Sequence, residues 1–243
     1  MKFAVLSDIH GNMFALRAVL SDIAKYNVDR ILCLGDLAMA GPEPNKTIDF
    51  VRTQDWTVIQ GNTDEMIANF NEDLFEKLHN DAPIMANALR QDVNEITEEN
   101  VSYLKNLPIN KCIEVDGVKI LLTHGSPRKN NENIFPNMDI KIIEDIFQDV
   151  DADLVFCGHT HMPCGYQTNS KITVVNDGSV GRPFTEIPNA CYVLAEVKNG
   201  SFTIEHKMVD YARISASEIL AKRSFDGAEK LAKMLIKPEL RHM

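Results

Sequence analysis

Six short apolar runs restrict the folds that this chain can form. The runs are KFAVLSD, RILCLGD, TVIQGN, VKILLTHG, DLVFCGH and ITVVNDG, and each is rich in branched residues and ends in small or polar ones. Runs of this length and composition indicate strands that are buried on both faces. Any fold of this chain therefore has to cover both faces of a sheet.

Helical patterns separate the early runs. Residues 12–25 carry apolar side chains at helical spacing, and residues 44–53 form a shorter helical pattern that begins near two prolines. The order strand, helix, strand, helix, strand is typical of a largely parallel sheet with crossover connections.

The pattern changes after Asn62. We expect helical stretches around Met66–Leu78, Ile84–Leu89 and Thr97–Leu107, with acidic residues throughout. This segment, at about 64–108, is predicted as a helical insertion or cap over the sheet. Plain crossover helices are the alternative interpretation of the same pattern.

The second half is rich in strands. Asp116-Gly117 and Asn199-Gly200 each stand between two apolar runs, which is a strong signal for a β-hairpin. Two amphipathic helices follow at about 212–236. No linker divides the chain, so residues 1–243 are predicted to form a single domain.

Composition excludes several classes of protein. The net charge of −10 argues against broad binding to nucleic acid or anionic membrane. No apolar run approaches the roughly 18–20 residues that span a bilayer. The five cysteines include no CxxC pair, and no signal-peptide cleavage site follows the first apolar run. These features predict a cytoplasmic protein with reduced thiols.

The apolar runs end in residues that bind metals. Carboxylate, amide and imidazole groups follow five of the runs, at Asp8, His10, Asp36, Asn62, His124, His159 and His161. Sites in open α/β sheets form at the carboxyl ends of strands, and these groups suit divalent transition metals. Each residue alone has an ordinary interpretation, as a turn, a helix cap or a strand end. Their convergence predicts one metal site.

The stretch CGHTHMPC offers two further interpretations. A zinc site made of Cys157, His159, His161 and Cys164 would be too cramped, because such sites usually separate their ligand pairs by about a dozen residues. The two histidines would point to the same side of an extended chain. In a kinked loop they would instead face two neighbouring ions.

Taken together, these motifs resemble the calcineurin-like metallophosphoesterase superfamily. The blocks SDIHGN, LGDLAMAGP, QGNTDEM, LTHGSP and CGHTHMP occur in the family's order, and NDGSVGRP extends the resemblance to about residue 185. The short length is similar to the small bacterial and archaeal phosphodiesterase-like branch. The resemblance implies an α/β (α+β sandwich) fold with four layers, αββα, in which helices flank two mixed β-sheets.

The resemblance also implies two metal ions. Asp8, His10 and His161 would hold one ion, Asn62, His124 and His159 the other, and Asp36 would bridge them. Manganese and iron are favoured over zinc and nickel. Asp36, Asn62 and His161 would serve catalysis, with a metal-bridging hydroxide attacking a phosphodiester or phosphoanhydride. A Ser/Thr protein phosphatase with the same metal core and a non-catalytic scaffold of the same fold are the alternatives.

Three residues are expected to contact a small, nucleotide-like phosphorylated substrate. They are Asn12, Thr63 and Arg182. Thr63 departs from the family's pattern, because many members have a histidine there that protonates the leaving group. Threonine cannot supply a proton near neutral pH, so we expect substrates whose leaving groups need little protonation. The sequence gives no oligomeric state.

Overall fold

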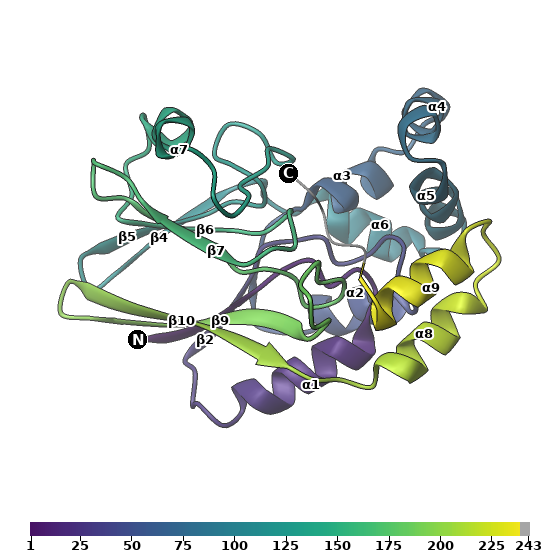
Figure 1. Ribbon diagram of the computed structural model, residues 1–243, viewed down its shortest axis with the longest axis horizontal. Coiled ribbons are helices and arrows are strands. Elements are labelled where there is room, and N and C mark those ends of the chain that lie inside the picture. The colour runs from purple at the N-terminus through teal and green to yellow at the C-terminus, as the bar shows by residue number, and fades with distance from the viewer. Residues whose placement is uncertain (239–243) are drawn as a thin grey trace.

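The computed structural model describes residues 1–238 and has four layers. Two five-stranded sheets stack face to face, helix α1 covers the outer face of one, and α7 covers the outer face of the other (Figure 1). The last five residues of the predicted domain, 239–243, lie outside the described part. The predicted four-layer fold with two mixed sheets is confirmed.

Both sheets combine parallel and antiparallel pairs. The first sheet has the order β10 (Ser201–Val209), β9 (Ala190–Lys198), β1 (Lys2–Leu6), β2 (Arg30–Cys33) and β3 (Thr57–Val58). The second has the order β4 (Lys111–Val115), β5 (Val118–Leu122), β6 (Leu154–Cys157), β8 (Thr173–Asn176) and β7 (Cys164–Gln167). Each sheet contains parallel pairs, such as β1 with β2 and β5 with β6. Their carboxyl ends therefore meet at one edge.

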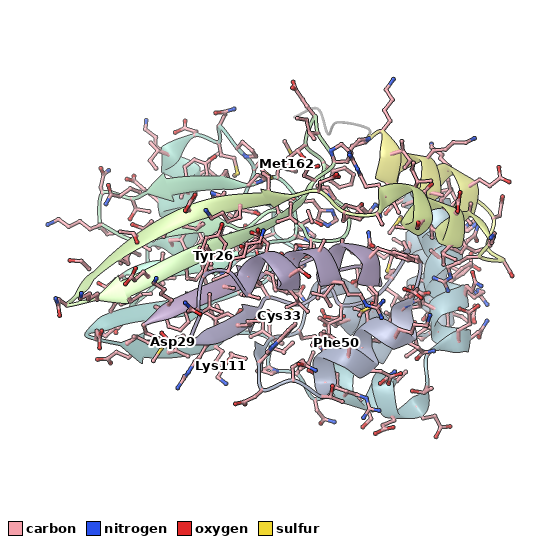
Figure 2. The ribbon with its side chains drawn as sticks, turned by 90° about the horizontal axis from the view of Figure 1, so that it is seen from below. Tyr26, Asp29, Cys33, Phe50, Lys111 and Met162 are labelled. Carbon is pink, nitrogen blue, oxygen red and sulfur yellow. The ribbon has the colours of Figure 1, made fainter. Side chains whose placement is uncertain are left out.

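The helices gather mainly at that edge and below the first sheet. They are α1 (Met13–Ile23), α2 (Pro44–Arg52), α3 (Asn62–Ala68), α4 (Glu72–Asp81), α5 (Pro83–Glu95), α6 (Glu98–Lys105), α7 (Ile140–Phe147), α8 (Arg213–Ala221) and α9 (Ala228–Ile236). Seen from below, α1 lies along the sheet, and α8 and α9 lie at the end opposite Asp29 and Lys111 (Figure 2). None of the helices within residues 1–238 has the length and apolar character needed to cross a bilayer.

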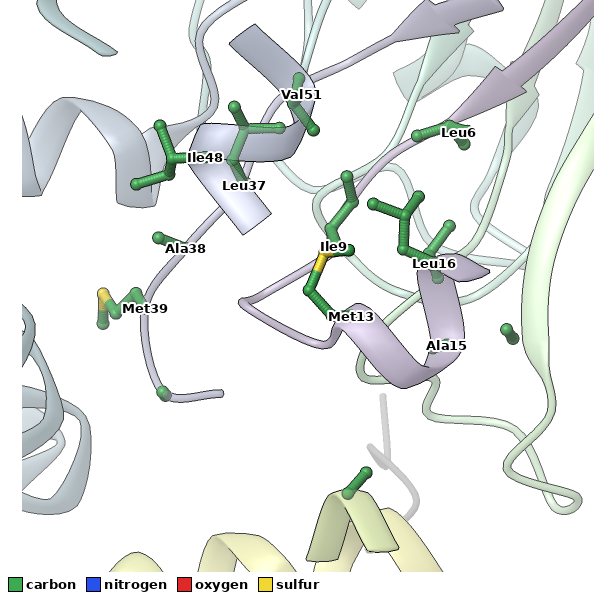
Figure 3. Packing of buried hydrophobic residues seen from close by; sticks show 14 of the residues in the cluster. Leu6, Ile9, Met13, Ala15, Leu16, Leu37, Ala38, Met39, Ile48 and Val51 are labelled. Atoms are coloured by element: carbon green, nitrogen blue, oxygen red, sulfur yellow. The ribbon is translucent and has the colours of Figure 1, made fainter. Parts of the chain in front are cut away.

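Strand β1 explains why the apolar runs are continuous rather than alternating. Phe3 and Val5 pack into the core between the two sheets, whereas Ala4 and Leu6 pack on the helical side. Both faces of the strand are thus buried, as expected for a sheet covered on both sides. On the helical side, Leu16 belongs to the same core cluster (Figure 3).

Both predicted hairpins are present, and their turns have the expected backbone. The φ angles are 48° and 80° at Asp116 and Gly117, and 53° and 72° at Asn199 and Gly200. Two successive residues with positive φ form the type I′ turn that matches the twist of the flanking strands.

Four local features differ from the sequence prediction or were missed by it. The stretch around Met66–Leu78 is divided between α3 and α4, because the side chain of Asn71 caps a new helix by accepting a hydrogen bond from Leu74 N at 2.9 Å. Strand β3 has only two residues, and helix α7 and strand β7 had not been predicted. Helices α3 to α6 occupy the segment predicted as a helical insertion.

Candidate metal centre

The loops that follow the parallel strands are held together by backbone pairing beyond the strand ends. Asp8 N donates to Gly35 O at 3.0 Å, and His10 N donates to Asp36 O at 2.9 Å. In the second sheet, Gly158 N donates to His124 O at 2.8 Å. Side chains from distant parts of the sequence are therefore fixed at one edge.

Five of the seven predicted ligands have a left-handed backbone. The φ angles lie between 46° and 67° at Asp8, His10, Asp36, His159 and His161. This conformation costs about 1–3 kcal/mol for a residue other than glycine, and it concentrates at functional sites. His159 and His161 thus lie in a kinked loop, and the interpretation as an extended strand is wrong.

Three imidazole rings are oriented by backbone carbonyl groups. The pairs are His10 Nδ1 with Met39 O at 3.0 Å, His124 Nδ1 with Leu34 O at 2.7 Å, and His161 Nδ1 with Arg182 O at 2.6 Å. A carbonyl oxygen only accepts hydrogen bonds, so each Nδ1 carries a proton. In the neutral ring, Nε2 is then a bare lone pair, which is the arrangement found in metal-binding histidines.

These lone pairs converge on one another and on Asp8. His10 Nε2 lies 3.1 Å from His161 Nε2, and Asp8 Oδ1 lies 3.0 Å from His161 Nε2. Asp8 Oδ1 is buried and has no hydrogen-bond donor with suitable geometry. Burial and the neighbouring His161 lower the pKa of His10 to about 4, so that ring is neutral near pH 7. The lone pairs of His10 Nε2, His161 Nε2 and Asp8 Oδ1 thus face one another with no proton between them. Such an arrangement is repulsive unless a cation lies between the three atoms, which is what a metal site provides.

A second set of ligand atoms lies beside the first. Asp36 Oδ2 is 3.4 Å from His124 Nε2 and 3.7 Å from His10 Nε2, which places this carboxylate between the two sets. Asn62 Oδ1 is 3.1 Å from His124 Nε2, and the ring of His159 lies 5.4 Å from that of His124.

Two groups of residues could each hold an ion. They are Asp8, His10 and His161, and Asp8, Asp36 and His124, with the ligand atoms of each group within 4.8 Å of one another. Burial lowers the pKa of His124, but the charges of Asp36 and Asp8 outweigh it and raise the pKa to about 10. The buried carboxylates therefore create a strong preference for positive charge. All seven predicted ligands lie at this centre, and its imidazole and carboxylate groups are suitable donors for metal ions.

Asp36 is held by the first turn of α3, which follows β3. Thr63 N donates to Asp36 Oδ1 at 2.8 Å, and Asp64 accepts from the backbone N of Asp36, Leu37 and Gly61 at 2.8, 2.9 and 3.0 Å. Burial, together with the charge of Asp36, raises the pKa of Asp64 to about 7. The carboxylate of Asp64 therefore joins the loop after β2, at Asp36 and Leu37, to the segment after β3, at Gly61.

The predicted substrate-binding residues have different positions. Thr63 and Arg182 line a pocket of about 160 Å³ that also exposes His10, Asp36 and His161. Asn12 does not line it: its Oδ1 caps α1 by accepting from Ala15 N at 3.1 Å, and its Nδ2 donates to Gly181 O at 2.9 Å. Both polar groups of Asn12 serve the fold, so we leave this residue out of the site.

The cysteines of CGHTHMPC do not join this centre. Cys157 is buried in β6, and Cys164 lies in β7, where burial raises its pKa to about 12. Neither belongs to a candidate ligand group within residues 1–238.

Two sets of residues at the site escaped the sequence analysis. Ser7 and Asp177 support Asp8, and the pocket has apolar side chains from Met39, Met66, Leu78 and Met85. Ser7 and Asp177 do stand inside the motif blocks SDIHGN and NDGSVGRP, which was the available signal. Met39 and Met66 also stand inside motif blocks, LGDLAMAGP and QGNTDEM, whereas Leu78 and Met85 stand outside them. A methionine or leucine at these positions did not indicate that it faces a pocket.

Comparisons with known proteins agree with this geometry. Over 236 residues the chain is 31% identical to the uncharacterized protein MJ0912 of Methanocaldococcus jannaschii, covering 90% of this chain and 91% of that protein. A metallophosphoesterase from Sphaerobacter thermophilus has a TM-score of 0.79 at 25% identity, covering 97% of this chain and 98% of that one. The hypothetical protein PH1004 from Pyrococcus horikoshii shares the fold, with a TM-score of 0.86 at 23% identity and 99% coverage of both chains.

The domain family is matched directly as well. Residues 1–200 match the calcineurin-like phosphoesterase superfamily domain, a match that includes all seven predicted ligands. The chain belongs to the calcineurin-like phosphoesterase superfamily.

Proposed function

We propose that this protein is a phosphoesterase that uses two transition-metal ions to hydrolyse phosphodiester or phosphoanhydride bonds in small, nucleotide-type substrates. The observation that carries the proposal is the meeting of His10 Nε2, His161 Nε2 and the unpartnered Asp8 Oδ1. When bound, two such ions make hydroxide available near neutral pH and offset the charge of the phosphate oxygens. Manganese or iron suits this mixture of imidazole and carboxylate ligands.

The protein's own groups would orient the phosphate rather than react with it. Phosphoryl transfer depends mainly on positioning and charge stabilisation, so no nucleophilic side chain is needed. The guanidinium group of Arg182 lines the pocket beside the candidate ligands and is a suitable contact for phosphate oxygens. Asn62 lies at the first position of α3, on the same pocket wall.

Among the described residues that line the pocket, none is an evident acid for the leaving group. The hydroxyl of Thr63 donates to Ala38 O at 3.1 Å, and burial with the neighbouring His124 lowers the pKa of His159 to about 4. A ring with that pKa is deprotonated near pH 7 and cannot act as a general acid. This supports substrates with good leaving groups, such as phosphoanhydrides and activated diesters.

The test compares metal content and hydrolysis in the wild type and in Asp36→Asn. The purified protein is reconstituted with manganese or iron, its metal content is measured by elemental analysis, and hydrolysis of bis(4-nitrophenyl) phosphate is followed. We expect about two ions in the wild type, and in the variant a loss of bound metal and a fall in kcat/KM of about 100-fold or more. Asp55→Asn, an exposed site, is the matched control.

The alternatives give different results in the same experiment. A protein that binds no stoichiometric metal in any reconstitution would be a scaffold. One that binds metal and hydrolyses a phosphoserine peptide, but neither the diester nor a dinucleoside polyphosphate, would be a protein phosphatase.

A further inference from the structure

The pocket beside the candidate metal centre has two unlike walls. The inner wall consists of candidate ligands: His10, Asp36, Asn62, His159 and His161. The outer wall consists of apolar side chains, Met39, Met66, Leu78 and Met85, with Thr63 and Arg182 at the boundary. A phosphate group at the inner wall would carry its organic substituent against the outer wall.

The outer wall offers little to a polar substituent. A thioether is only a weak hydrogen-bond acceptor, and the hydroxyl proton of Thr63 is already directed at Ala38 O. Among the described residues that line the outer wall, Arg182 carries the only charge, and its Nη1 lies 3.3 Å from Met85 Sδ. A sugar, polyol or peptide placed here would lose hydrogen bonds to water without gaining equivalent ones.

The outer wall is assembled from separate elements. Met39 comes from the loop after β2, whereas Met66, Leu78 and Met85 come from α3, α4 and α5, the helices beside the loop edge in Figure 1. Figure 3 shows Met39 in the loop after β2, apart from Met13 and Leu16 of α1. Met66, Leu78 and Met85 are only partly buried, unlike the core residue Met13. Met39, by contrast, is only 2% exposed and belongs to the core cluster. Met66, Leu78 and Met85 therefore have surface left for a ligand.

We propose that Met39, Met66, Leu78 and Met85 form a subsite for a flat, uncharged aromatic group of the phosphate-ester substrate, either an aryl ring bonded to the phosphate oxygen or a nucleobase carried on its sugar. Methionine is flexible and polarizable, and its sulfur makes favourable contacts with aromatic rings. The wall carries no array of donors and acceptors that could read the edge of a nucleobase, so the subsite would accept aryl rings and different bases alike. This inference rests on the proposed phosphoesterase function and specifies its substrate class.

The first experiment uses two diesters with the same leaving group. The metal-loaded protein is assayed with 4-nitrophenyl phenyl phosphate and 4-nitrophenyl ethyl phosphate, and each kcat/KM is divided by the spontaneous hydrolysis rate. Because the released group is identical, the ratio reports binding of the retained substituent. We expect the phenyl diester to be favoured by about tenfold or more.

Substitutions assign this preference to the outer wall. Met85→Gln and Met66→Gln keep the length of the side chain but introduce an amide, and we expect each to reduce the phenyl preference by about threefold or more. Met85→Leu keeps an apolar side chain and should retain the phenyl preference. This variant also controls for misfolding caused by a substitution at position 85. Met208→Gln, at an exposed position on β10, is the matched control and should change nothing.

A binding experiment separates failure of the subsite from failure of the enzyme. Calorimetry measures the affinity of the metal-loaded protein for phenylphosphonate and for methylphosphonate, and we expect the phenyl compound to bind about tenfold more tightly. If neither diester is hydrolysed, the proposed phosphoesterase function is wrong. The calorimetric titration then still shows whether the protein prefers the phenyl compound and so whether the aromatic subsite exists. Equal normalised rates for the diesters, or equal affinities for the phosphonates, overturn the subsite while metal-dependent hydrolysis can stand.

Discussion

The hydroxyl oxygen of Ser7 lies 2.6 Å from Oδ1 of Asp177, a carboxyl group that is completely buried. The same hydroxyl lies 2.5 Å from Asp8 Oδ2. A hydroxyl group has a single proton, so two such short contacts to carboxyl oxygens require a second proton. Burial, with the nearby charge of Asp8, raises the pKa of Asp177 well above its usual range, so Asp177 is the protonated partner.

We expect Asp177→Asn to leave the protein almost unchanged, because an uncharged amide replaces an uncharged acid. The free energy of unfolding should change by less than about 1 kcal/mol, and metal content should be retained. Ser7→Ala should cost about 1–3 kcal/mol, because it leaves buried carboxyl oxygens without a donor. Urea unfolding of the metal-free proteins and elemental analysis of the reconstituted ones measure both effects.

Ser102→Ala, an exposed serine on α6, is the control for Ser7→Ala and should stay within about 0.5 kcal/mol of the wild type. A large loss of stability or of metal in Asp177→Asn would mean that Asp177 is ionised and that our proton assignment is wrong.

Gly61→Ala should disrupt the metal centre by steric displacement. A Cβ atom at Gly61 would lie 2.1 Å from Asp36 Oδ1 and 2.3 Å from Asp36 N, so Asp36 would be displaced from its position between His10 and His124. We expect a loss of about 1–3 kcal/mol in unfolding free energy, together with reduced metal content. Denaturation and elemental analysis test this.

Gly165→Ala is the matched control for that substitution. A Cβ atom there would meet only Val174 O, at 3.7 Å, so stability should change by less than about 0.5 kcal/mol and bound metal should not change. Retention of both ions in Gly61→Ala would show that Asp36 is not needed where the structure places it.

Thr63→His should extend activity toward poorer leaving groups. The wild type lacks an evident proton donor, so its rates should fall steeply as the pKa of the leaving group rises. An imidazole at this pocket position would donate a proton, and general acids contribute about 100-fold or more to such reactions. The measurement is kcat/KM across a series of aryl and alkyl phosphodiesters.

Thr63→Val controls for the loss of the hydroxyl group and should leave the leaving-group dependence of the wild type unchanged. A flat dependence in the wild type, or a clear preference for alkyl monoesters, would contradict the argument.

The ion pair between Asp92 and Arg223 should make stability depend on pH. Arg223 Nη1 lies 2.6 Å from the buried Asp92 Oδ1, without good hydrogen-bond geometry, and Asp92 Oδ2 accepts from Ala40 N at 3.0 Å. Burial raises the pKa of Asp92 from 3.8 to about 6, although Arg223 lowers it. The folded state therefore holds this proton more tightly than the unfolded chain does.

The stabilising contribution of that proton is fully present below pH 3.8 and is lost as the pH rises through 6. Between pH 5 and pH 7.5 we expect the stability of the wild type, relative to Asp92→Asn, to fall by roughly 1.4 kcal/mol. Urea unfolding of the metal-free proteins at both pH values measures it. Glu95→Gln, which removes the half-exposed carboxylate beside Arg223, should not cancel the effect, and a difference that grows with pH would overturn the prediction.

The sequence predicted most of the strands, and the residues predicted as ligands lie together, because both depend on local patterns. The apolar runs that predicted β1, β2, β5, β6 and β8 reflect burial on both faces of the sheet. Such burial requires apolar residues at consecutive positions, so it can be recognised from the sequence of each run alone. The predicted ligands follow the ends of such runs, and the topology of parallel strands brings those ends together. The stretch around Met66–Leu78 was wrong as one helix because capping by Asn71 competes with helical continuation.

The sequence by itself determined the buried strands and the metal-binding side chains that follow them, since hydrophobic pattern and motif order are encoded along the chain. The two-sheet fold was implied by the family resemblance that those motifs carry. Only the tertiary structure decided which nitrogen of each histidine faces the site, that Asn12 serves the fold, and that methionines line the pocket. The partners involved are far apart: His124 is oriented by a carbonyl 90 residues away, and Ser7 meets Asp177 across 170 residues. A hydrogen bond across such distances depends on how the layers pack, and no local pattern records that packing.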